Sequence, residues 1–300
     1  MLDGAMGTMI YSKGVFLNTC FDELCMTRPD LVAGIHAEYV SAGADIIETN
    51  SFAANRIKLG HHGLADKVGE INTRAAELAL QVAGDDVFVA GSVGPCLTSA
   101  QMWQSENADA IRDAFTEQIT ALVNGGVHLV LLETFSHLDE LMLAAEVARA
   151  SGVPVFASFM VNEDGETAMG QGLEDFVSAL DASDHVDGIG INCGVGPAHA
   201  YAALERALAL STKPFIVMPN AGLPREVDGR MLYLTSPEYF TSYAKRFIEL
   251  GARVVGGCCG TTPEHIREAA RAIKSLSGVK THVQIRSYTP EDVTVSPVPV

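Results

Sequence analysis

Residues 127–159, VHLVLLETFSHLDELMLAAEVARASGVPVFASF, contain the pattern from which the fold follows. The apolar run Leu129–Leu132 is too short for a helix and lacks polar alternation, as expected of a strand buried on both faces. Apolar residues then recur at three- and four-residue spacing over Leu138–Ala148, which predicts a helix that ends by Gly152. A second buried run, Val155–Phe159, follows. This order predicts a strand, a helix and a parallel strand.

The same unit repeats along the rest of the chain. Further apolar runs of strand length are Asp45–Glu48, Val87–Ala90, Gly188–Ile191, Pro214–Met218 and Arg253–Val255. Leu2-Asp3 reads as the remnant of one more strand at the very start. Segments with helical spacing lie between the runs, and start signals at Pro29, Pro237 and Pro263 open three of them. Eight strands alternating with eight helices predict an α/β fold with a parallel sheet.

We favour a (β/α)8 TIM barrel, because eight such units in one chain of this length match that fold. An open doubly wound sheet would show the same alternation, but no G-x-G-x-x-G follows the first strand. We expect a single barrel domain over residues 1–279. The prolines after Ser287 predict that residues 280–300 are an extended tail or a truncated interdomain linker. Three long loops, Tyr11–Thr27, Gly94–Glu106 and Asn220–Leu234, would lie on the C-terminal face of the barrel.

Composition and charge exclude several classes of protein. The chain has 300 residues, with 20 Lys plus Arg against 37 Asp plus Glu, which gives a net charge of −17. So acidic a chain is a poor partner for nucleic acid or anionic lipid. We find no apolar stretch of membrane-span length and no secretory signal, and six cysteines are too few for a disulfide scaffold. These features predict a cytoplasmic protein.

Polar residues follow the predicted strands at one end only. These tips read Asp3-Gly4, Glu48-Thr49-Asn50, Gly94-Pro95, Glu133-Thr134, Asn192-Cys193-Gly194, Pro219-Asn220-Ala221-Gly222 and Gly256-Gly257-Cys258-Cys259-Gly260. In a parallel barrel the carboxyl ends of the strands meet on one face, where active sites are built. We therefore expect these groups to converge.

Three of the six cysteines lie at such tips: Cys193, Cys258 and Cys259. Flanking glycines allow a turn tight enough to aim neighbouring sulfurs at one point. Three thiolates suit zinc and leave a fourth position for water or substrate, as in a catalytic site. Two alternatives stay open, namely cysteines buried as small apolar residues and a phosphate cradle at Gly256–Gly260.

The remaining candidate ligands are given no role. Cys20, Cys25 and Cys96 lie in predicted loops, where simple loop thiols are expected. His61-His62 is expected in an exposed turn after the second strand.

A zinc ion held by three thiolates carries a net charge of −1 and is a modest Lewis acid. It suits activation of a fourth sulfur, because a coordinated thiol is deprotonated outright. The chemistry implied is attack by a substrate thiol on an electrophilic carbon. If that thiol belongs to an amino acid, the carboxylates Asp3, Glu48 and Glu133 are candidates to receive its ammonium group. The N–H groups of Gly4–Gly7 are candidates for its carboxylate.

Six motifs resemble one known family. They are Leu2–Thr8, Glu48–Phe52, Glu133–Phe135, Gly190–Cys193, Pro219–Gly222 and Gly256–His265. Together, in order over residues 1 to about 275, they are similar to the homocysteine S-methyltransferase family, which includes the homocysteine module of cobalamin-dependent methionine synthase. The resemblance implies a (β/α)8 barrel with Zn²⁺ held by the catalytic residues Cys193, Cys258 and Cys259. It also implies that the residues that bind the substrate homocysteine are Asp3, Gly4, Glu133 and Asn220.

Finer features resemble the N-terminal half of bifunctional homocysteine S-methyltransferase/methylenetetrahydrofolate reductase proteins. These features are Ile57-Lys58-Leu59 with His62-Gly63-Leu64, and Val227–Arg230 ahead of Ser236–Phe240. A reductase domain is therefore a possible partner in a longer protein, and Met1, lying almost on the first motif, predicts a trimmed domain.

Three hypotheses follow for the function. The first is a zinc-dependent methyltransferase acting on homocysteine, with methylfolate, S-methylmethionine, S-adenosylmethionine or betaine as donor. The second is a homocysteine-binding module that needs partner cobalamin, folate or reductase domains for turnover. The third, a metal-free lyase or aldolase, lacks a Schiff-base lysine after any predicted strand.

Overall fold

The computed structural model describes residues 1–97, 103–227 and 230–276. Seven strands form one parallel sheet in the order β1-β2-β3-β4-β5-β6-β9. Their bounds are β1 Ile46–Glu48, β2 Phe88–Val93, β3 Leu129–Phe135, β4 Val155–Phe159, β5 Gly188–Asn192, β6 Phe215–Met218 and β9 Val254–Val255. Each of these strands was predicted from an apolar run in the sequence, and all seven predictions are confirmed.

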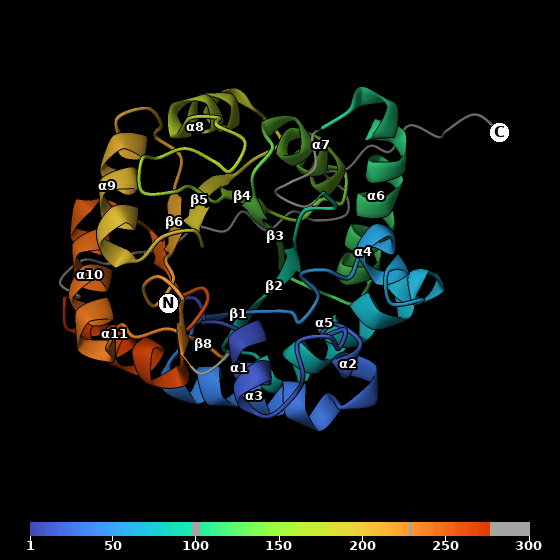
Figure 1. Cartoon of the computed structure of the whole chain (residues 1–300), viewed down its shortest axis with the longest axis horizontal. Coiled ribbons are helices and arrows are strands. Elements are labelled where there is room, and N and C mark those ends of the chain that lie inside the picture. The colour runs from blue at the N-terminus through green and yellow to red at the C-terminus, as the bar shows by residue number, and fades with distance from the viewer. Residues whose placement is uncertain (98–102, 228–229, 277–300) are drawn as a thin grey trace.

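Eight long helices connect the strands and pack on the outside of the curled sheet (Figure 1). They are α3 Pro29–Ala42, α5 Val68–Ala83, α6 Ala108–Asn124, α7 Leu138–Arg149, α8 Leu173–Ala182, α9 Pro197–Leu208, α10 Pro237–Leu250 and α11 Pro263–Ser275. The start signals act as expected, since proline opens α3, α10 and α11. The predicted alternation of strands and helices is therefore confirmed.

Short elements interrupt the segments predicted as long loops. Residues 7–27 contain α1 Gly7–Ser12 and α2 Leu24–Thr27, and the segment after β1 contains α4 Arg56–Gly60 and the 3-10 turn η1 Ala65–Lys67. A further 3-10 turn, η2, spans Ser105–Asn107. The predicted loop Asn220–Leu234 instead holds an antiparallel pair, β7 Arg225–Val227 with β8 Arg230–Leu232. These elements are too short to show a period in the sequence.

The segment Met1–Asp3 lies between the two edge strands of the sheet. The N–H of Leu2 donates to Val255 O at 2.9 Å, and the N–H of Asp3 donates to Ile46 O at 3.0 Å. Leu2 forms an isolated parallel bridge with Ile46. The predicted eighth strand is therefore a single bridge rather than a strand, because only two residues are in position to pair.

Apolar side chains pack in two layers on either side of the sheet. The larger layer fills the space between sheet and helices. The smaller one gathers residues from both edge strands and from the strands between them: Leu2, Ala90, Leu129, Leu131, Ile216, Met218 and Val254, with Ile46 and Phe156 against them. Because side chains of β1 and β9 share this cluster, the sheet must curl until its edges approach each other.

Two predicted segments fall partly or wholly outside the described residues. These are the tail at residues 280–300 and residues 98–102 of the loop that follows β2. Across the described part of the chain, no helix is both long enough and apolar enough to cross a membrane.

Candidate metal centre and substrate cavity

The three cysteines at the strand tips come together. The sulfur atoms of Cys193, Cys258 and Cys259 all lie within 4.8 Å of one another, and each residue is half-buried. Cys193 follows β5 and the Cys258-Cys259 pair follows β9, two positions along the sheet. The prediction that these strand tips converge is confirmed.

The local backbone accounts for this convergence. Cys193 has a φ of 58°, which turns the chain sharply at the end of β5. Beyond β9, the N–H of Cys258 donates to Pro219 O at 2.9 Å, and the N–H of Gly257 donates to Asp3 O at 2.9 Å. A Cβ on Gly257 would lie 2.5 Å from Thr261, so only glycine fits there. The backbone thus fixes the sulfurs before any ligand binds.

The turn Gly256–Gly260 is unsuited to cradle a phosphate, which was an open alternative. The N–H groups of Gly256, Gly257, Cys258 and Gly260 already donate to acceptors on neighbouring segments. A phosphate cradle needs such groups free and convergent.

The cluster fits a zinc ion by distance and by chemistry. Tetrahedral zinc with Zn–S bonds of about 2.3 Å places its sulfurs about 3.8 Å apart, within the observed spread. Hydrogen bonds from Cys193 and Cys258 lower the pKa of Cys259 to about 3, whereas the hydrogen bond with Cys193 raises the pKa of Cys258. Negative charge therefore concentrates on one sulfur, and a divalent cation is the group that would let all three ionise together.

Three carboxyl groups lie beside the cluster. Asp3 and Glu133 are buried, and Glu48 is half-buried. Burial raises the pKa of each, and for Glu48 the nearby charge of Glu133 raises it further. Asp3 Oδ1 has no hydrogen-bond partner. A cation among these groups would favour their ionised forms.

Two residues to which the sequence analysis gave no individual role, Tyr39 and Thr261, support this region through hydrogen bonds. The hydroxyl of Tyr39 donates to Ala5 O at 2.7 Å. Thr261 Oγ1 accepts from the N–H of Ala5 at 3.0 Å and donates to Cys258 O at 2.7 Å. A Cβ on Gly4 would lie 2.7 Å from Thr261 Oγ1, so glycine is required there. Thr261 thus ties the first strand tip to the cysteine turn.

One cavity of about 580 Å³ joins these parts. Its wall includes the three cysteines, the three carboxyl-bearing residues and the backbone from Gly4 to Thr8. It also reaches Phe52, Lys58 and the His61-His62 pair. The three-cysteine cluster and the acidic group therefore open into the same space.

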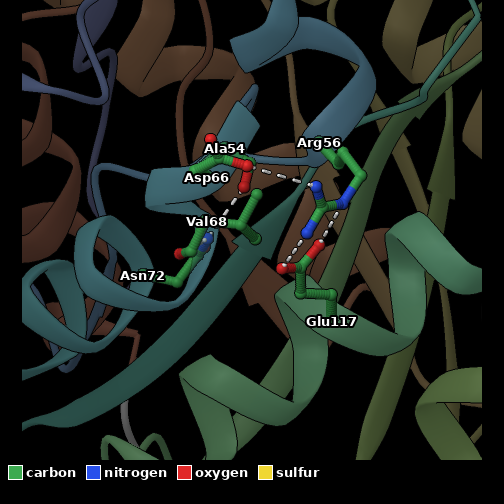
Figure 2. A network of polar contacts seen from close by, with 6 residues as sticks. All are labelled: Ala54, Arg56, Asp66, Val68, Asn72 and Glu117. Atoms are coloured by element: carbon green, nitrogen blue, oxygen red, sulfur yellow. Dashed lines mark hydrogen bonds and ion pairs between the residues drawn. The ribbon is translucent and has the colours of Figure 1, made fainter. Parts of the chain in front are cut away.

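Figure 2 shows the polar contacts of Arg56, the first residue of α4, which also carries Lys58. Arg56 makes a bidentate pair with Glu117 on α6, at 2.9 and 2.7 Å, and its guanidinium lies 3.8 Å from Asp66. These exposed contacts add little stability, but they connect α4 to α6.

The residues to which the sequence analysis gave no role, three cysteines and the His61-His62 pair, differ in burial. Cys20, Cys25 and Cys96 are all buried. Cys20 and Cys96 lie in loops, as predicted, whereas Cys25 lies in α2, so the loop prediction is wrong for Cys25. Burial raises the pKa of all three thiols, which suits cysteine as a small buried residue. His61-His62 is exposed, as predicted.

Asn220 is buried, and its Oδ1 has no hydrogen-bond partner. Its predicted place in the substrate pocket stays a prediction.

Fold and site together define a parallel α/β protein with a thiolate cluster able to hold a divalent ion. A family model described as homocysteine S-methyltransferase matches residues 1–273, and the chain belongs to this family.

Two curated relatives are named methionine synthase. The one from Mycobacterium tuberculosis (strain ATCC 25618 / H37Rv) is 34% identical over 307 aligned positions, covering 96% of this chain and 25% of that protein. The one from Mycobacterium leprae (strain TN) is 35% identical over 290 aligned positions, covering 90% of this chain and 24% of that protein. The chain thus spans about a quarter of the length of these relatives.

Solved structures of the homocysteine methyltransferase MmuM from Escherichia coli are similar over nearly their whole length. The metallated form has a TM-score of 0.76 at 25% identity, covering 90% of this chain and 94% of that one. The oxidized form has a TM-score of 0.75 at 27% identity, covering 92% of this chain and 95% of that one.

Proposed function

We propose that this chain transfers a methyl group to the thiol of homocysteine, giving methionine, and that Cys193, Cys258 and Cys259 hold Zn²⁺. The observation that carries the proposal is the single cavity shared by the three sulfurs and the carboxylates of Asp3 and Glu133. Such a cavity offers one end to a thiol and another to an ammonium group, which matches an amino acid with a thiol side chain.

The chain's own residues would orient this substrate. Asp3 Oδ1 is a buried acceptor without a partner, and Glu133 lies beside it, so both suit the α-ammonium group. Gly4 borders the cavity. Asn220, a buried residue whose Oδ1 has no hydrogen-bond partner, is the further residue that we assign to the substrate. Holding the amino-acid end fixes the direction in which the thiol points.

Bound zinc would supply a substrate thiolate at neutral pH, where a free thiol with a pKa near 8.5 is mostly protonated. The metallated relative MmuM supports a metal in this family.

The fold proposed for this function is a (β/α)8 barrel over residues 1–279, closed by residues 1–3. The hydrogen bonds of Leu2 and Asp3 to both edge strands support closure, as does the cluster that joins β1 to β9. We place the protein in the cytoplasm on its sequence features.

The test is an assay of the purified, zinc-loaded chain with homocysteine and each donor in turn: S-methylmethionine, S-adenosylmethionine, betaine and methyltetrahydrofolate. We expect methionine with one of them, together with about one zinc per chain. Binding of homocysteine that does not depend on zinc would contradict the proposal.

A second candidate is a homocysteine-binding module that requires partner domains for turnover. It is favoured by the finding that the chain spans about a quarter of its methionine synthase relatives. Under this proposal zinc-dependent binding of homocysteine persists, but no free donor gives methionine. A methylenetetrahydrofolate reductase domain as partner stays a prediction of the sequence resemblance.

A further inference from the structure

Asn192 lies between the two halves of the site. It is the last residue of β5, directly before Cys193, and is 1% exposed. Its Oδ1 accepts from the N–H of Thr134 at 2.8 Å and from the hydroxyl of Ser158 at 2.6 Å. The acceptor end of this amide is therefore fully used by two neighbouring strands.

The donor end of the amide faces the site. Asn192 Nδ2 donates to Thr134 Oγ1 at 2.7 Å and lies 3.4 Å from Glu133 Oε2. The same nitrogen lies 4.0 Å from Cys258 Sγ. One buried amide thus touches the substrate-side carboxylate and a sulfur of the cluster.

Thr134 adopts a conformation that needs support. Its φ is 65°, in the left-handed region that β-branched residues avoid. The pairing of β3 with β4 shifts register between Leu132 and Phe135, which places Thr134 in a bulge. Both the N–H and the hydroxyl of Thr134 bind Asn192, so this one side chain holds the bulge in place.

The bulge sets the direction of the neighbouring Glu133. Bulges beside active sites often re-aim a side chain in this way. The hydroxyl of Ser92 also donates to Glu133 Oε1, so the carboxylate is held from two sides. The separation between this carboxylate and the sulfur cluster therefore depends on Asn192.

We infer that Asn192 is a positioning residue that fixes the distance between the thiolate cluster and Glu133, and so selects homocysteine over cysteine. The inference rests on the proposed function. Cysteine is shorter by one methylene, so its thiol and ammonium group cannot both reach a rigidly spaced pair of sites. A methylene is typically worth about 10- to 200-fold in such discrimination.

Packing alone does not explain the choice of this residue. An apolar side chain of similar size would leave the N–H of Thr134 unpaired in a buried place. An aspartate would set a third negative group against Glu133 and Cys258. Only a carboxamide offers acceptors to the bulge and donors to the site together.

The experiment uses Co²⁺-loaded protein, in which thiol binding is followed by sulfur-to-cobalt charge-transfer absorption. Homocysteine and cysteine are titrated into wild type, Asn192→Ala, Asn192→Asp, Thr134→Gly and the double variant Thr134→Gly/Asn192→Ala. Metal content and thermal unfolding are measured for each.

We expect the preference for homocysteine to fall about tenfold in Asn192→Ala and in the isosteric Asn192→Asp, with metal content unchanged. In the double variant, Thr134→Gly should restore part of the preference for homocysteine, because glycine adopts a φ of 65° without support from a side chain. That rescue separates positioning from a general loss of packing.

The inference would be overturned if both Asn192 variants kept the wild-type preference for homocysteine over cysteine. It would also be overturned if the variants bound both thiols more weakly by the same factor and Thr134→Gly restored nothing in the double variant. Failure of the wild-type protein to bind homocysteine would instead contradict the proposed function, and the inference with it.

Discussion

The six cysteines form two groups of three that differ in burial and in their position relative to the strands of the sheet. Cys193, Cys258 and Cys259 follow two strands of the sheet, are half-buried and have sulfurs within 4.8 Å of one another. Cys20, Cys25 and Cys96 are buried, and of these three Cys20 alone lines the cavity. Position at a strand tip, rather than composition, therefore turns a cysteine into a metal-ligand candidate.

The electrostatic settings of the two groups differ at Cys259. Hydrogen bonds from the neighbouring thiols lower the pKa of Cys259 to about 3, whereas burial raises the pKa of Cys25 to about 12 and also raises that of Cys96. The pKa values of Cys193 and Cys258 are raised as well, so Cys259 is the thiol of the first group that favours the ionised form before a metal binds.

The largest effect is expected from removing one sulfur of the cluster. Cys259→Ala should abolish zinc binding and methyl transfer, because two thiolates hold the ion far more weakly than three. Metal content after dialysis and methionine formation measure this. The matched control Cys96→Ala removes a buried thiol and should keep its zinc. Zinc retained at full stoichiometry in Cys259→Ala would contradict the assignment of the ligands.

Much of this comparison could be predicted from the sequence. Apolar runs followed by polar residues placed the seven strands and the tips that carry Cys193, Cys258 and Cys259, because a buried parallel strand leaves a strong local signal. The hairpin β7–β8 was missed, since two three-residue strands are too short to show a period.

Other features depend on tertiary contacts that no local pattern encodes. The burial of Cys25 and Cys96 follows from which helices cover them. The role of Asn192 depends on its contacts with Thr134, which lies 58 positions away in the chain. The positive φ of Thr134 has no sequence signal either, because threonine rarely adopts it.

The next largest effect concerns thiol reactivity. In metal-free protein, iodoacetamide should modify Cys259 first, because this half-buried thiol has a pKa lowered to about 3, and should modify Cys25 and Cys96 last, because both are buried and have raised pKa values. Bound zinc should protect the first group. Peptide mass spectrometry at several times measures the order. Early labelling of Cys25 in the folded protein would remove the distinction between the groups.

A smaller effect is expected at the acidic end of the cavity. Glu133→Gln should weaken homocysteine binding roughly 10- to 100-fold, since a hydrogen bond to a charged group contributes about 1.5–3 kcal/mol. Zinc content should stay the same. Titration calorimetry measures the change, and Glu205→Gln, on an exposed face of α9, serves as the control. Equal affinities of the two variants would show that Glu133 does not meet the ammonium group.

The smallest effect on the reaction is expected from Asp22, beside Cys20. Burial raises its pKa to about 6, above the value in the unfolded chain. Because the unfolded state ionises first, Asp22 lowers stability as pH rises from about 4 to 6, by up to about 3 kcal/mol. The free energy of unfolding is measured by urea titration for wild type and Asp22→Asn at pH 4 and pH 7. Between these two pH values it should fall less in the variant than in wild type. An equal fall in the free energy of unfolding for both proteins would contradict a raised pKa of Asp22.

X-ray absorption at the zinc edge tests the metal site and its substrate together. The zinc-loaded chain should show three sulfur neighbours at about 2.3 Å and one lighter atom. Adding homocysteine should replace that lighter atom with a fourth sulfur at the same distance. Nitrogen ligands in place of any of the three sulfurs, or an unchanged shell at saturating homocysteine, would contradict a site built from Cys193, Cys258 and Cys259 to bind a substrate thiol.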